Sequence, residues 1–152
     1  MTTKVESVKT ALASHIADGA VLYQRLRNYH WNVRGREFFR LHQVFEHLYQ
    51  DWEEIVDRLA ERAVSLGQRP PSTLGELLAG TQLQEEEDKV PNDREMVRRV
   101  IADLTTVLDA LKATSADAES EGDFGTTNML QDVVEKQEKR RWMLESFLAD
   151  GR

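Results

Sequence analysis

The position of the prolines constrains this chain more than any other feature. All three, Pro70, Pro71 and Pro91, lie near the middle of 152 residues. Proline interrupts a helix because it has no amide hydrogen and its ring clashes with the preceding turn. On both sides of this region the apolar residues recur with a helical period, and no long stretch alternates as a strand would. The chain is therefore predicted to be all-α, with long helices in two halves.

The helices are expected in two pairs within one domain that spans residues 1–152. Gly35 separates the first pair, and a polar segment that ends at Pro91 links the two halves. Two helix pairs with a long connection between them are typical of a four-helix bundle with a crossover. The expected helices, including a short one in the crossover, lie at about 4–33, 37–66, 73–79, 93–118 and 124–148.

The composition excludes several classes of protein. The chain has no cysteine, so a metal site would have to use histidine and carboxylate ligands. No apolar run approaches the roughly 20 residues of a membrane span, and the N-terminal residues do not suggest a secretory signal. The expected compartment is the cytoplasm, with nucleoid association left open. The net charge of −7 provides no general attraction for nucleic acid.

Histidine and carboxylate residues share one stripe of the second predicted helix. His42, Glu46, Asp57 and Glu61 fall within about 100° of the helical wheel. An acidic stripe is usually a solvated face. Here His30 and His42 add imidazole to the carboxylates, and together these groups form a ligand set that suits iron, manganese or zinc.

The helical rise decides how such a site could be built. His42 and Asp57 are fifteen residues apart, or about 22 Å along a helix at about 1.5 Å per residue. They cannot bind one ion within a single chain, because ligands lie about 2 Å from the metal. A two-fold dimer could bring His30, His42 and Glu46 of one chain to Asp57 and Glu61 of its mate. An intrachain di-iron site is not expected, because no Glu precedes a His by three residues.

The segment NYHWNVRGREFFRLHQVFEHLYQDWEEIVDRLAERAVSLGQRPP resembles the signature region of the Dps family, the DNA-binding proteins from starved cells. The family pattern is His-Trp-Asn-x-x-Gly, then Phe and Leu-His, then an acidic residue four positions later, then Asp-x-x-x-Glu. The matching residues are His30, Trp31, Asn32, Gly35, Phe39, His42, Glu46, Asp57 and Glu61. The helical layout agrees over nearly the whole chain.

The resemblance implies a ferritin-like bundle that assembles into a hollow homo-dodecamer. It implies iron as the metal, with oxidation of iron(II), preferably by hydrogen peroxide, and storage of the ferric product as protection against oxidative damage. The implied ligands are His30, His42 and Glu46 of one subunit and Asp57 and Glu61 of its neighbour.

Three further residues acquire roles through the resemblance. Trp31 follows a ligand and is expected either to quench stray radicals or to pack at an interface. Asp123, together with Glu121, is expected near a three-fold pore that attracts cations, although a solvated helix connection explains these acidic residues equally well.

DNA compaction is an alternative function from a different class. The first ten residues contain two lysines and one glutamate, and the C-terminal FLADGR has no basic tail. Binding to phosphates needs several Lys or Arg contacts. We therefore expect DNA binding to be weak or absent. A metal-free structural bundle is a third alternative, and the complete ligand set argues against it.

Overall fold

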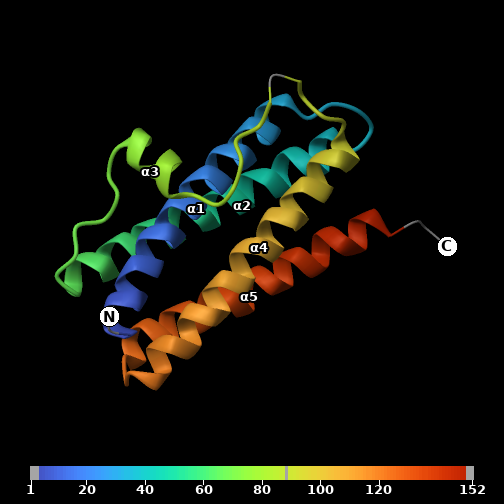
Figure 1. Cartoon of the computed structure of the whole chain (residues 1–152). Coiled ribbons are helices and arrows are strands. Elements are labelled where there is room, and N and C mark those ends of the chain that lie inside the picture. The colour runs from blue at the N-terminus through green and yellow to red at the C-terminus, as the bar shows by residue number, and fades with distance from the viewer. Residues whose placement is uncertain (1–3, 88, 150–152) are drawn as a thin grey trace.

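The computed structural model describes residues 4–87 and 89–149, which form five helices and no strand. One antiparallel pair of helices packs against another, as Figure 1 shows. The predicted all-α bundle with a short extra helix in the crossover is thus confirmed. The helices are α1 (Lys4–Asn32), α2 (Phe38–Ser65), α3 (Leu74–Gly80), α4 (Asp93–Ser120) and α5 (Phe124–Leu148).

Local sequence signals set the helix ends. The Asn92 side chain accepts a hydrogen bond from the Glu95 amide at 2.9 Å and begins α4. α4 continues two residues beyond its predicted end, and Gly122, with a φ of 74°, then makes the turn into α5. Gly67 has a φ of 80° and ends α2 in the same way.

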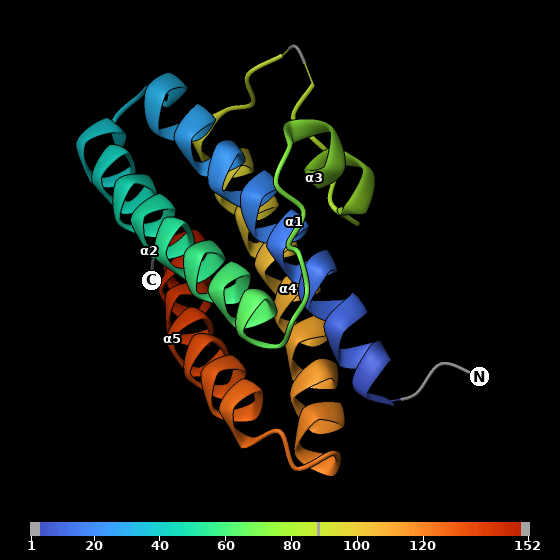
Figure 2. The same cartoon turned by 90° about the vertical axis from the view of Figure 1, so that its left-hand side faces the viewer.

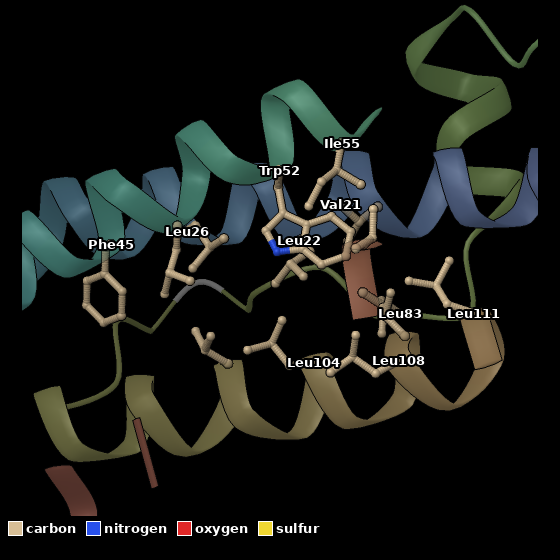
Figure 3. Close-up of a cluster of buried hydrophobic side chains, with 14 of the residues drawn as sticks. Val21, Leu22, Leu26, Phe45, Trp52, Ile55, Leu83, Leu104, Leu108 and Leu111 are labelled. Carbon is tan, nitrogen blue, oxygen red and sulfur yellow. The ribbon is translucent and has the colours of Figure 1, made fainter. Parts of the chain in front are cut away.

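The core lies between the two helix pairs, and Figure 3 shows part of it. Phe45 and Trp52 of α2 are fully buried and lie opposite α4, where Leu104 and Leu108 are also fully buried. Burying an apolar side chain of this size contributes about 1.5–3 kcal/mol. This packing keeps α2, which carries most of the candidate ligands, in a fixed orientation.

The crossover is held to the bundle by buried charges, although the sequence suggested only a polar loop. Asp18 of α1 is fully buried and accepts hydrogen bonds at 2.8–2.9 Å from the Thr81 hydroxyl and from the Gln82 amide and side chain. Farther along, Arg25 pairs with Glu86 of the crossover at 3.3 Å and with Asp103 of α4 at 2.8 Å. In Figure 2 the crossover runs along α1 toward the start of α4. None of the described helices is long and apolar enough to cross a membrane.

Candidate metal centre

The turn between α1 and α2 brings the two predicted histidines together. α1 ends at Asn32, and Gly35 then adopts a φ of 111°, a conformation that side chains other than glycine rarely allow. The chain thereby reverses before α2 begins at Phe38. The imidazole rings of His30 and His42 stack with their centroids 3.8 Å apart and their planes 14° apart.

Each histidine is oriented by the backbone of the other. His30 Nδ1 lies 2.7 Å from the His42 carbonyl oxygen, and His42 Nδ1 lies 2.7 Å from the His30 carbonyl oxygen. A carbonyl only accepts, so both Nδ1 atoms are donors, and each ring in its neutral form has its lone pair on Nε2. A carbonyl partner at one ring nitrogen is the usual support of a metal-binding histidine. The pair is therefore prepared to bind a metal through its Nε2 atoms.

Aromatic side chains flank the histidine pair. Phe38 stacks on His42 with the ring centroids 5.0 Å apart, and Tyr49 meets His30 edge-on at 5.3 Å. Glu46, one helical turn after His42, is half-buried. His30 is only 9% exposed. The imidazoles thus have an aromatic ring on each of two sides.

Asp57 and Glu61 lie farther along the same helix. α2 is continuous from Phe38 to Ser65, so the separation of about 22 Å between His42 and Asp57, expected from the helical rise, applies here. Both carboxylates are exposed. Among the described residues, no group of three or more His, Asp or Glu side chains could hold a metal ion. The structure brings His30 and His42 together but leaves Asp57 and Glu61 apart from them.

Trp31 lies on the surface beside this site. Its side chain is 58% exposed, and the Arg27 guanidinium lies 4.8 Å from the centre of its ring.

The two remaining histidines are not part of the pair. His47 is exposed, whereas His15 is buried and shares a 2.8 Å hydrogen bond with Thr114. Burial lowers the pKa of His15 to about 4, against the opposing effect of Asp18.

The predicted pore residues lie at the turn between α4 and α5. Asp123 caps α5, where one carboxylate oxygen accepts from the Thr126 amide at 3.1 Å, and it pairs with Arg62 of α2 at 2.6 Å. Burial raises its pKa, but the hydrogen bonds from Thr126 and Arg62 outweigh burial and bring the pKa below its ordinary value. Glu121 is exposed. The Asp123 charge is therefore already balanced within the chain.

Sequence reasoning did not find the contacts that Tyr49 makes with the site. Tyr49 follows Glu46 by three residues and His42 by seven, which are same-face spacings on a helix. The buried charges of Arg25 and Glu86 were missed as well. Their signal was weaker, because long side chains of this type usually extend into solvent.

The comparisons with known proteins agree with this fold. The ferritin-like domain family matches residues 9–152. The DNA protection during starvation protein of Helicobacter pylori is 36% identical over 133 residues, which cover 88% of this chain and 92% of that protein. The crystal structure of a Dps protein from Bacillus brevis has a TM-score of 0.92 and 37% identity, and the match covers 97% of this chain and 99% of that one.

A second solved structure resembles the chain to a similar degree. The Dps protein from Vibrio cholerae O1, described as a member of a broad superfamily of ferritin-like diiron-carboxylate proteins, has a TM-score of 0.91 and 33% identity. The match covers 97% of this chain and 92% of that one. By its fold and its family match, the chain is a ferritin-like bundle. Within that class, it belongs to the Dps family.

Proposed function

We propose that this chain is the subunit of an iron-storing cage that oxidises iron(II), preferably with hydrogen peroxide. The observation that carries the proposal is the pair His30 and His42, whose Nδ1 atoms are both bound to backbone carbonyls while both Nε2 atoms remain able to bind a metal. The resemblance to Dps proteins supports iron as the metal. The oxidation would consume iron(II) and peroxide, the two reagents that cause oxidative damage, and storage would hold the ferric product.

The proposed site needs two subunits. His30, His42 and Glu46 form one half-site, and Asp57 and Glu61 form the other. The continuous α2 helix separates the halves within one chain. A two-fold dimer with antiparallel α2 helices would create two equal sites, each from both chains. Imidazole tolerates iron(II) and carboxylate oxygens favour iron(III), so the combined set suits an oxidation that ends in ferric mineral.

The surface supports assembly. Large apolar side chains are exposed at both ends of the α1–α2 turn and on α3, among them Trp31 at 58%, Phe39 at 84% and Leu74 at 81%. Large contiguous apolar patches usually mark a contact with another protein, and in the proposed assembly these side chains would lie at such contacts. The family resemblance extends this expectation to a hollow dodecamer, with iron entering at a three-fold pore near Glu121 and Asp123.

The proposal is tested by adding iron(II) and peroxide to the purified assembly and following ferric absorbance. The His30→Ala/His42→Ala variant should lose the fast phase of oxidation. The matched control is His47→Ala, which removes an exposed histidine of the same helix outside the pair and should behave as wild type. Equal rates in all three proteins would overturn the proposed ferroxidase site. Native mass measures the number of subunits separately.

DNA protection, which the name of the Helicobacter pylori relative describes, would follow from this chemistry without DNA contact. A dodecamer would carry 12 × −7 = −84 formal charges. Such a particle repels phosphate unless basic residues gather at one place. Direct compaction of DNA is the second candidate function, and the charge counts against it.

A further inference from the structure

Tyr49 lies between the proposed metal ligands and a second tyrosine. Its ring meets His30 edge-on, with the ring centroids 5.3 Å apart. On another side it meets Tyr23 of α1 edge-on, with the ring centroids 6.0 Å apart and the planes at 88°. One oxidisable side chain thus contacts an expected ligand, His30, and has a second oxidisable ring next to it.

The surroundings of Trp31 favour the loss of an electron less than the surroundings of Tyr49 do. The Arg27 guanidinium lies 4.8 Å from the centre of the Trp31 ring. A cation over an aromatic face is attracted to its electron density, and this attraction is lost when the ring becomes a radical cation. Arg27 also lies 5.2 Å from the Tyr23 ring. A tyrosine loses its hydroxyl proton together with the electron and becomes a neutral radical, so a nearby cation opposes its oxidation less.

We infer that Tyr49, rather than Trp31, gives up an electron and a proton when peroxide meets a single iron(II) ion at the histidine pair. This inference rests on the proposed function. It adds a proposed electron donor to the site, where the sequence led us to expect that Trp31 either quenches radicals or packs at an interface. Tyr23 is the adjacent ring that can share the oxidation.

The reaction balances in three steps. One iron(II) breaks the peroxide O–O bond, which gives iron(III), hydroxide and a hydroxyl radical. The radical takes the hydroxyl hydrogen of Tyr49 and leaves as water, so that a neutral tyrosyl radical remains. A second iron(II) reduces this radical, and a proton from solvent restores the Tyr49 hydroxyl. The sum is two iron(II), one peroxide and one proton converted to two iron(III), one hydroxide and one water.

The consequence is that iron ions that arrive one at a time can still reduce peroxide completely. Tyr49 would hold the oxidising equivalent between the first and the second iron. Because Tyr49 is half-buried against α1, the radical would be shielded from the solution until the second iron arrives.

The test is electron paramagnetic resonance of samples frozen shortly after peroxide is added to the assembly with less than one iron(II) per site. Wild type should show a tyrosyl radical, and Trp31→Phe should retain it. Tyr49→Phe should reduce the signal to the level seen without peroxide, and trapped hydroxyl radical should increase. Tyr29→Phe is the matched control. Tyr29 lies in the crossover network with Arg25 and Glu86, so the radical should persist in that variant.

A second measurement separates loss of the radical from loss of the site. Anaerobic binding of cobalt(II), followed by its visible absorption, should be the same in Tyr49→Phe and wild type, because the ring that contacts His30 is kept. A tyrosyl signal that survives in Tyr49→Phe, or a wild-type signal that disappears in Trp31→Phe, would overturn the inference. If wild type oxidises iron with peroxide but forms no tyrosyl radical, this inference alone fails. If wild type does not oxidise iron, the proposed function fails with it.

Discussion

Replacing Arg25 by methionine should destabilise the bundle by about 3–5 kcal/mol, the usual cost of leaving a buried charge without its partner. Arg25 lies 2.8 Å from Asp103 and 3.3 Å from Glu86, and the three side chains are 8%, 14% and 7% exposed, respectively. Methionine keeps an apolar stem of similar length but leaves Asp103 without the cation it pairs with, while Glu86 keeps its ion pair with Arg99. The crossover would then lose one of its two main attachments to α1.

The loss of stability caused by Arg25→Met should depend on pH. Burial raises the pKa of Asp103 to about 6, and the neighbouring Arg25 charge opposes that rise. A carboxyl whose pKa is raised by folding stabilises the folded state below its unfolded pKa, and this contribution is lost as the pH rises through the folded pKa. The Arg25→Met defect should therefore be smaller at about pH 5 than at about pH 8, because protonated Asp103 needs no counter-ion.

The assay is unfolding in guanidinium chloride, followed by tryptophan fluorescence at equal subunit concentration because assembly itself adds stability. Arg98→Met is the matched control. Arg98 is on α4, is 53% exposed and pairs with Glu95 at 3.5 Å, so its loss should cost less than about 1 kcal/mol. The reasoning is refuted if Arg25→Met costs no more than Arg98→Met, or if its cost is the same at both pH values.

Two further predictions concern the α4–α5 turn and DNA. Asp123→Ala should cost about 1–2 kcal/mol in chemical unfolding, and Asp123→Asn less, because asparagine retains the helix cap. Since the pKa of Asp123 is lowered, its contribution should be present above pH 3.8 and fade in stronger acid. In a gel-shift assay at physiological salt and neutral pH, the assembly should leave duplex DNA unshifted, and a discrete shifted band would contradict the charge argument.

Much of the fold follows from local signals in the sequence. The prolines and Gly35 separate the helices, and Asn92 begins α4 as a cap residue should. The end of α4 was the exception, because the helix was predicted to end at about residue 118 and instead continues to Ser120. The turn at Gly122 satisfies the final carbonyls of the helix and allows it to continue.

The candidate site was less accessible to sequence reasoning. Spacing indicated that His42 and Asp57 could not share an ion within one chain, since this depends only on the rise of a helix. Spacing could not show that His30 and His42 orient each other through their carbonyls, because that bond depends on how α1 and α2 meet across the turn. The attachment of Glu86 to Arg25 joins residues 61 positions apart, and no local pattern records it. That the five candidate ligands bind iron stays a prediction.

The most direct test of the shared site is complementation between two inactive variants. His30→Ala/His42→Ala lacks one half-site, and Asp57→Ala/Glu61→Ala lacks the other. When the two are co-assembled in equal amounts, about half of the dimers contain one chain of each, and one of the two sites in such a dimer is intact, so about one quarter of wild-type peroxide-dependent iron oxidation should return. Each variant alone should stay inactive. No recovery in a verified mixed assembly would contradict a site built from two subunits.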